Sequence, residues 1–187
     1  MKKLAVMFTG VGYTCIKPLL YYTAAMAAEC GYEVLRLDYG EDVHSFKGRT
    51  PEDLLPIIEI AKERSLKQLE SVSWQEYDDI VFISKSIGTT IACQVEQELK
   101  LAVRQFLMTP ITATIPYLEQ VQGIFFAGTS DPYIEEALIL SAAEKYSEKV
   151  GMIFSGCNHS LEKKGCTENN VKNLLEILKK LEKFLKK

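Results

Sequence analysis

The sequence contains no C-x-x-C pair, although it has five cysteines, which are Cys15, Cys30, Cys93, Cys157 and Cys166. An odd number of cysteines without that spacing fits neither a disulfide framework nor a standard zinc site. Cys157 and Cys166 with the intervening His159 supply three candidate metal ligands, but a fourth is missing and the spacing matches no zinc pattern. We therefore expect buried thiols, and neither a metal nor another cofactor.

Long hydrophobic runs and blocks of one charge are also scarce. Met1, Lys2 and Lys3 form a charged start, but the apolar run that follows has only five residues, too few for a signal peptide or a membrane span. The 22 basic residues are scattered except in the lysine-rich tail, and the net charge is −3, which argues against a nucleic-acid surface. We expect a cytoplasmic protein that binds neither nucleic acid nor membranes.

The remaining composition is that of an ordinary folded domain. Apolar residues make up 47% of the chain and charged residues 25%, close to the average for a soluble domain. No segment has the bias toward Pro, Gly and Ser that marks disorder. The length of 187 residues corresponds to about one domain, so we expect a single domain over residues 1–187.

Six short apolar runs alternate with segments of helical periodicity. The runs are continuous rather than alternating, which is typical of parallel strands covered by helices on both faces. They span residues 4–8, 33–37, 80–83, 105–108, 123–127 and 150–154. Strand and helix in regular succession predict an α/β three-layer sandwich with right-handed crossovers. In such folds, ligands bind beyond the carboxyl ends of the strands.

Three helices are marked by end signals or by an apolar stripe. A helix over residues 19–30 has Pro18 in its first turn and Gly31 after its last residue. The segment 50–53, TPED, combines a hydroxyl N-cap, proline at the first helical position and an acid at the third. The last helix carries apolar residues at three- and four-residue spacing from 171 to 185, and we expect this stripe to pack on the sheet.

The turn after the first strand, residues 9–13 (TGVGY), contains two glycines. Its backbone amides are candidates to face an anion, or the segment is simply a tight turn between strand and helix. A dinucleotide fingerprint needs glycine three positions after Gly12, where the chain has Cys15, and no P-loop lysine pattern is present. The sequence therefore disfavours nucleotide binding.

A serine stands just beyond the third strand, in the segment Ser84-Lys85-Ser86-Ile87-Gly88. On a sharp turn between strand and helix, the Ser86 hydroxyl is exposed at the sheet edge, and the next amide can donate to a developing oxyanion. Serine is also a common helix N-cap, so this segment alone leaves both interpretations open.

Two further side chains follow later strands: Asp131 comes after the fifth and His159, one of only two histidines, after the sixth. Each has an ordinary alternative, because aspartate caps helices and a loop histidine is often only hydrogen-bonded. The carboxyl ends of parallel strands meet at one edge, so the fold itself would bring these two residues and Ser86 together. The joint pattern predicts a catalytic triad.

Three segments resemble motifs of the α/β-hydrolase superfamily in their order and spacing: ISKSIGTTIA, FFAGTSDPY and SGCNHSLE. The last two look particularly like loops of small, lidless esterase-like and dienelactone-hydrolase-like members. The resemblance implies a minimal version of the fold, with about six parallel strands in the order 2-1-3-4-5-6 and without the family's two antiparallel N-terminal strands. Ser84 stands where the family's elbow usually has glycine, and Ser86 remains the candidate nucleophile.

The resemblance also implies a role for each residue. Ser86 attacks an acyl carbonyl, His159 acts as the base, and Asp131 orients the imidazole. The oxyanion hole consists of the Ile87 amide and one amide from residues 10–13, with Val11 favoured by position. The implied activity is hydrolysis of small carboxylic esters or thioesters through an acyl-enzyme, without a cofactor.

Substrate choice is less determined. The segment 109–122, where lids usually enter in this family, is too short for a cap domain, so we expect an open site. The long loop 38–49 is expected to overhang the same edge, with His44 as a surface residue rather than a second base. Three aromatic side chains are candidates to line the site, or else are partly buried aromatics: Tyr13, Tyr117 and Tyr133.

Two other functions remain open from the sequence. An acyltransferase with the same triad would use another acceptor than water and would look identical in sequence. A non-catalytic binding protein on a hydrolase scaffold is the alternative from a different class. The complete set of triad residues counts against this second alternative, because the fold alone does not require them.

Overall fold

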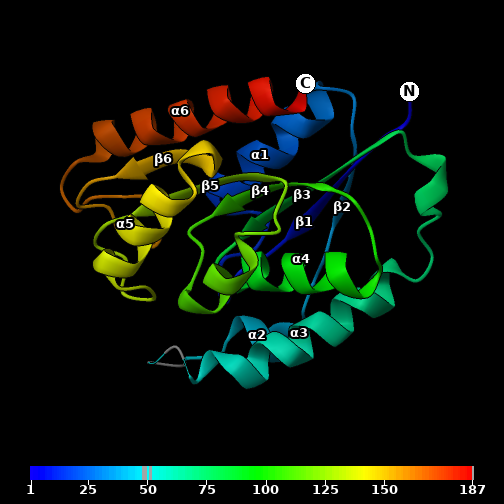
Figure 1. Cartoon of the computed structure of the whole chain (residues 1–187), viewed down its shortest axis with the longest axis horizontal. Helices are drawn as coiled ribbons and strands as arrows, with labels where there is room; N and C mark the ends of the chain where they lie inside the picture. Colours follow the sequence, from blue (N-terminus) through cyan, green and yellow to red (C-terminus); the bar gives the residue numbers. More distant parts are fainter. Residues whose placement is uncertain (48–49, 51, 187) are drawn as a thin grey trace.

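The structure is a computed structural model that describes residues 1–47, 50 and 52–186. Within these residues, six parallel strands form one sheet in the order β2-β1-β3-β4-β5-β6 (Figure 1). Each strand lies at a predicted run, and the predicted order is confirmed. The strands are β1 (Lys3–Phe8), β2 (Glu33–Arg36), β3 (Asp79–Lys85), β4 (Arg104–Met108), β5 (Gly123–Gly128) and β6 (Val150–Phe154).

Helices cover both faces of the sheet, which confirms the predicted three-layer architecture (Figure 1). The helices are α1 (Pro18–Glu29), α2 (Glu41–His44), α3 (Leu54–Leu69), α4 (Ile87–Glu98), α5 (Glu136–Lys145) and α6 (Thr167–Leu185), with 3₁₀ turns at Trp74–Glu76, Thr112–Tyr117 and Ser147–Lys149. α1 and α6 pack on one face, and α3 and α4 cover the other, with α2 beside α3. α5 packs next to β5.

Side chains of the strands alternate between two cores. In β1, Met7 points to the face covered by α1 and α6, whereas Val6 and Phe8 point to α3 and α4. All three are fully buried, which explains why the run is apolar throughout rather than at every second position. In β3, Ile83 lies on the side of α1 and α6, and the two-residue period of the strand places Lys85 on that side as well.

One of the two predicted helix starts agrees with the structure, and the other is shifted. α1 begins at Pro18, as predicted. Ahead of α3, the Asp53 amide donates to Thr50 Oγ1 at 3.3 Å and the Thr50 amide donates to Asp53 Oδ2 at 2.9 Å. This reciprocal pair lies in the preceding turn, because the N-cap of α3 is Asp53 rather than the predicted Thr50. The helix itself begins at Leu54, later than predicted, and Pro51 lies outside the described residues.

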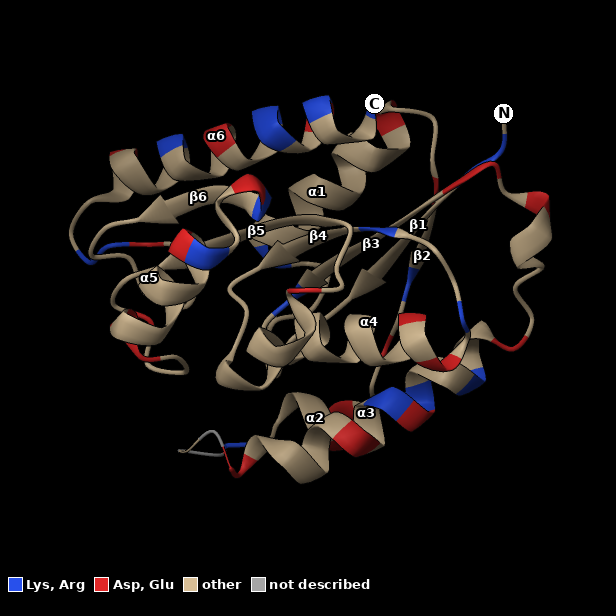
Figure 2. Cartoon of the chain, viewed as in Figure 1, with Lys and Arg blue, Asp and Glu red and all other residues tan. Residues whose placement is uncertain are grey.

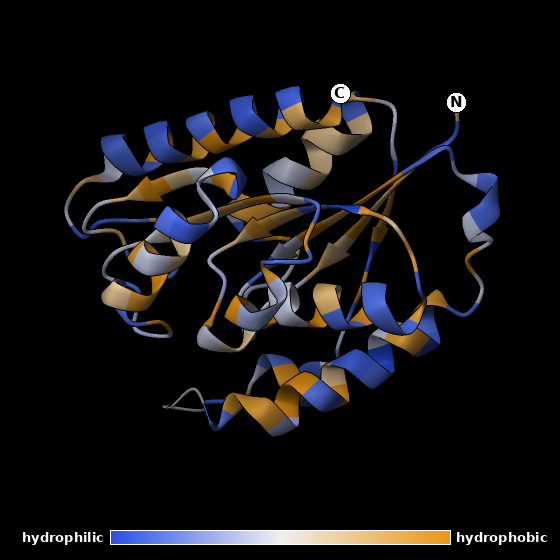
Figure 3. Ribbon diagram, in the orientation of Figure 1, coloured by the Kyte–Doolittle hydropathy of each residue, from blue (hydrophilic) through white to orange (hydrophobic). Residues whose placement is uncertain are grey.

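α6 is amphipathic: Figure 2 shows lysines along its outer side, and Figure 3 shows the hydrophobic side facing the sheet. Leu181 and Leu185 are buried, as predicted. The first half of the stripe differs from the prediction, because Val171 and Leu175 are 62% and 50% exposed. There α6 borders an apolar groove shared with α1. No helix among the described residues is long and apolar enough to cross a bilayer.

Candidate active site

Ser86 forms a sharp turn between β3 and α4. Its backbone has φ 60° and ψ −127°, a left-handed conformation that costs a non-glycine residue about 1–3 kcal/mol and persists only where its surroundings hold it. Two backbone hydrogen bonds do so here: the Ser86 amide donates to Met108 O at 3.1 Å, and the Thr89 amide donates to Ser86 O at 2.9 Å. The turn directs the Ser86 side chain away from the strand, toward the sheet edge.

Two glycines allow the backbone to pack closely around this turn. A Cβ at Gly88 would lie 2.5 Å from the carbonyl oxygens of both Phe8 and Thr9, and a Cβ at Gly10 would lie 2.9 Å from the Ser86 Cβ. Both distances are too short for real atoms, so α4 and the turn after β1 approach the serine only because these positions lack side chains. The nucleophile turn and the glycine turn are therefore in direct contact.

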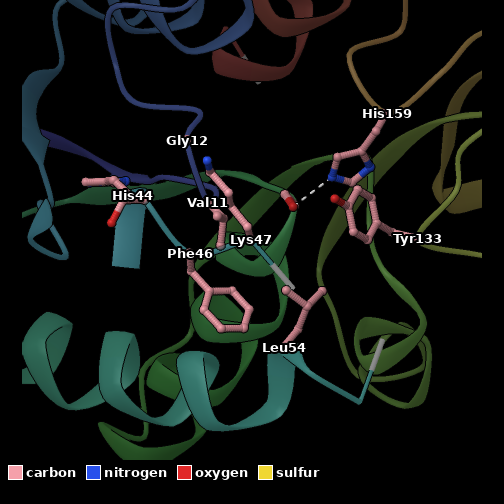
Figure 4. Close-up of a pocket in the computed structure, with 10 residues that line it drawn as sticks. Val11, Gly12, His44, Phe46, Lys47, Leu54, Tyr133 and His159 are labelled. Atoms are coloured by element: carbon pink, nitrogen blue, oxygen red, sulfur yellow. Dashed lines mark hydrogen bonds between the residues drawn. The ribbon is translucent and has the colours of Figure 1, made fainter. Parts of the chain in front are cut away.

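The structure brings the three predicted triad residues together. His159 Nε2 lies 2.7 Å from Ser86 Oγ, as the dashed line in Figure 4 marks, and His159 Nδ1 lies 2.6 Å from Asp131 Oδ2. The Asp131 carboxylate accepts a hydrogen bond from Nδ1–H, which leaves Nε2 without a proton and able to accept the one from the Ser86 hydroxyl. The second oxygen of Asp131 accepts a hydrogen bond from the Tyr133 amide at 2.9 Å.

The environment keeps the imidazole neutral. Burial, and after it the nearby positive charge of Lys85, lower the pKa of His159 to about 4, although the hydrogen bond and the charge of Asp131 oppose the shift. The Asp131 side chain is fully buried, and that of His159 is 14% exposed. At neutral pH the histidine is therefore in the form that can accept a proton.

The two predicted oxyanion donors adjoin the serine. The Ile87 amide opens α4 directly after Ser86, where the helix dipole favours negative charge. Val11 belongs to the turn that contacts Ser86 and lines the same cavity. Within the described residues, neither amide donates to another group, so both are available to a ligand.

A cavity of about 450 Å³ opens beside the serine and the histidine (Figure 4). Its described lining combines apolar walls with one cationic side chain. The lining residues are Val11, Gly12, His44, Ser45, Phe46, Lys47, Leu54, Ser86, Tyr133 and His159. The loop after β2 contributes Phe46 and Lys47 to this lining, and the start of α3 contributes Leu54. The described part of this loop therefore borders the carboxyl edge of the sheet, as predicted.

Only one of the three predicted tyrosines lies at this cavity. The Tyr133 ring lines it, with its centroid 4.6 Å from that of the His159 ring. Tyr13 turns away: its hydroxyl accepts a hydrogen bond from the Leu19 amide, and it borders the groove between α1 and α6. The Tyr117 hydroxyl accepts a hydrogen bond from the Gln94 side chain of α4, and Tyr117 lines a different pocket. The predictions for Tyr13 and Tyr117 are therefore corrected.

His44 differs from its prediction, whereas Ser84 lies where the choice of Ser86 as candidate nucleophile requires. His44 is more buried than predicted, with its side chain 11% exposed, and its Nε2 lies 3.0 Å from Asp38 Oδ1. Ser84 is fully buried within β3 and does not reach the cavity. Sequence reasoning missed Lys47 and Leu54 as lining residues, and the only available signal was the length of the loop that carries Lys47 and leads toward α3.

The cysteines and acids form no evident metal site. Among the described residues, no group of three or more His, Cys, Asp or Glu side chains is placed to hold a metal ion. All five cysteines are free. The side-chain amide of Asn173 donates to Cys157 Sγ at 3.4 Å. Both ring nitrogens of His159 are hydrogen-bonded, to Asp131 and to Ser86.

No protein-family model matches the sequence, and no curated protein matches it either. Solved structures do match. The chain is similar to a candidate hydrolase of the alpha/beta superfamily from Xanthomonas campestris pv. campestris, at 18% identity over 100% of this chain and 99% of that chain, with a TM-score of 0.70. It is also similar to Est1E from Butyrivibrio proteoclasticus (11% identity, 98% and 87% of the two chains, TM-score 0.67). A third similar structure is an alpha-beta serine hydrolase homologue from Coxiella burnetii, at 14% identity over 95% of this chain and 84% of that chain, with a TM-score of 0.60. The chain therefore has the α/β-hydrolase fold.

Proposed function

We propose that this protein is a serine hydrolase that cleaves small carboxylic esters or thioesters. The observation that carries the proposal is the hydrogen-bonded series from Ser86 through His159 to Asp131, with distances of 2.7 and 2.6 Å. A hydroxyl with a neutral base beside it, and a buried carboxylate behind that base, is the arrangement that activates a serine. The shared fold with structures named as hydrolases adds support.

The reaction has two halves that use the same groups. Ser86 Oγ forms a bond to the acyl carbonyl carbon while His159 Nε2 takes the hydroxyl proton. The tetrahedral oxyanion accepts hydrogen bonds from the Val11 and Ile87 amides. Its carbon then releases the alcohol or thiol, which leaves with the proton from His159. Water attacks the acyl-enzyme in the same way and releases the acid and free Ser86.

The cavity supports small substrates. Its volume of about 450 Å³ lies toward the lower end of the range for ligand pockets. Val11, Phe46, Leu54 and Tyr133 give it an apolar part beside the reacting atoms, next to polar lining of similar extent. We therefore assign the acyl group, short or aromatic, to this cavity, with the leaving group toward solvent.

The proposal is tested by treating the purified protein with a fluorophosphonate probe and recording its intact mass. This probe captures an activated serine without knowledge of the substrate. We expect one adduct on the wild-type protein and none on Ser86→Ala or His159→Ala, because the first lacks the nucleophile and the second lacks its base. Both variants are expected to keep the wild-type circular dichroism spectrum.

The chain offers a matched control in Ser84, which is two residues away but fully buried in β3. Ser84→Ala is expected to keep the adduct. Absence of an adduct on folded wild-type protein, or an adduct that persists in Ser86→Ala, would overturn the proposal. With labelling in place, a panel of esters and thioesters of increasing acyl length then tests the assigned substrate class.

A further inference from the structure

Lys85 directly precedes the candidate nucleophile and is only 2% exposed. Among the described residues, Lys85 and Asp131 are the only charged side chains in the buried group. A lysine normally extends its ammonium group into water, and burying a charge is costly unless the surroundings compensate. Burial lowers the pKa of Lys85 to about 7. The two-step mechanism gives this residue no part, so its position calls for another explanation.

The contacts of Lys85 join it to the turn that carries Val11. Its Nζ lies 4.6 Å from the centroid of the Tyr13 ring, a cation–π contact that is strongest where the cation is desolvated. A Cβ at Gly10 would lie 3.3 Å from Lys85 Cδ, so the other end of the turn rests on the lysine stem. Gly10 and Tyr13 are also joined by two backbone hydrogen bonds, of 3.1 and 3.2 Å. Lys85 thus contacts both ends of the turn that positions the Val11 amide.

Three titratable groups face Lys85, each from a different loop: Tyr13 after β1, Asp131 after β5 and His159 after β6. The negative charge of Asp131 raises the pKa of Lys85 against the effect of burial. The positive charge of Lys85 in turn lowers the pKa of His159. A cation at this place therefore favours the neutral imidazole, which is the form that accepts the serine proton.

We propose that Lys85 is a positioning residue of this site, whose ammonium group holds Tyr13, and with it the turn at residues 10–13, against Ser86. This inference rests on the proposed function, because the turn matters to catalysis only if Val11 serves an oxyanion. Lys85 touches no reacting atom itself. It acts through the Val11 amide, which it keeps in place, and through His159, where its charge adds to the effect of burial in favouring the neutral imidazole.

The first test compares Lys85→Met, which keeps the length of the side chain and removes its charge, with the wild-type protein. We expect the rate constant of fluorophosphonate labelling to fall by about 10- to 100-fold, since a small misplacement of a catalytic group has an effect of that order. The acid-side midpoint of the pH profile of labelling is expected to move to higher pH by about one unit. A merely structural role for Lys85 would leave that midpoint unchanged.

The second test does not depend on activity. Hydrogen exchange of residues 10–13 is measured at pH 6, where Lys85 carries its charge. The amides of Gly10 and Tyr13, which are hydrogen-bonded across the turn, are expected to exchange about tenfold faster in Lys85→Met. The matched control is Lys3→Met, because Lys3 lies over the Tyr32 ring at 5.1 Å, at the opposite end of the sheet. This control is expected to leave both the exchange of residues 10–13 and the labelling rate unchanged.

The two tests separate the inference from the proposed function. If the wild-type protein is not labelled, the proposed hydrolase function is refuted. Faster exchange of residues 10–13 in Lys85→Met would still show that Lys85 holds this turn in place. Unchanged exchange of residues 10–13 in folded Lys85→Met overturns the inference, whatever happens to labelling. If Lys85→Met does not fold, Tyr13→Leu and Tyr13→Phe replace it. Tyr13→Leu should show the faster exchange of residues 10–13, because the aromatic ring is gone. Tyr13→Phe keeps the ring and should exchange like the wild-type protein. Wild-type exchange in Tyr13→Leu also overturns the inference.

Discussion

The Asp131 carboxylate uses both of its oxygens, one for His159 and one for the Tyr133 amide, and its side chain is fully buried. Asparagine keeps this shape but carries no charge, so the imidazole loses its stabilising partner and the preferred tautomer changes. Asp131→Asn is therefore expected to lower the labelling rate constant by about 10³- to 10⁴-fold. The rate is measured under excess probe, with the melting temperature as the check on folding. A variant that keeps more than a tenth of the wild-type rate would contradict the role proposed for Asp131.

The pKa of His159, lowered to about 4 by burial and by Lys85, predicts an unusual pH profile. A lowered pKa keeps the base neutral to lower pH, so the labelling rate should stay near its plateau below pH 6.5 and decline toward pH 4. The profile is measured on the wild-type protein between pH 4 and 8, with the hydrolysis of the probe subtracted. An acid-side midpoint at 6.5 or above would show that the imidazole is not shielded in this way.

α6 illustrates how a single helix presents two kinds of apolar residue. Leu181 is fully buried against the sheet, whereas Leu175, on the same stripe, is 50% exposed. Leu181→Ala is expected to lower the free energy of unfolding by about 2–5 kcal/mol, because a cavity remains. Leu175→Ala serves as the matched control and should change it by less than about 0.5 kcal/mol. Urea unfolding measures both, and equal effects would mean that the groove between α1 and α6 is closed in solution.

The pairing of β1 with β3 brings the glycine turn and the serine turn together. β1 and β3 pair in parallel with Phe8 opposite Ser84, so the two turns that follow them start side by side. The glycine turn and the serine turn can then touch because Gly10 and Gly88 lack side chains. The geometry of the candidate nucleophile and oxyanion donors therefore depends on the register between β1 and β3, in which Phe8 pairs with Ser84, a residue more than 70 positions away in the sequence.

The stability of the protein should depend on pH through its buried lysine. The pKa of Lys85 is lowered from 10.5 to about 7, so between these values the unfolded chain binds more protons than the folded one. The free energy of unfolding should therefore rise with pH from 7 to 9, with a slope of up to about 1.4 kcal/mol per pH unit from this group. Lys85→Met should lose that part of the slope and be no less stable than wild type at pH 7. Parallel slopes in the two proteins would show that Lys85 is solvated.

Local chemistry was sufficient for much of the fold and for the three central residues of the site. The six strands follow from continuous apolar runs, and α1 starts at the proline that marked its start. Ser86, Asp131 and His159 were recognisable because each follows a strand, and parallel strands end at one edge whatever their order. The family resemblance added the strand order, which no local pattern contains.

The directions of side chains in turns and loops could not be obtained in this way. Tyr13 and Tyr133 are both aromatic residues beyond strand ends, yet only Tyr133 lines the cavity, while Tyr13 covers Lys85. Lys85 looks like a surface residue in the sequence but is buried, because the turn after β1 folds over its stem. Such placements depend on which distant segments pack together, and that information lies in the packed chain rather than in any short stretch of residues.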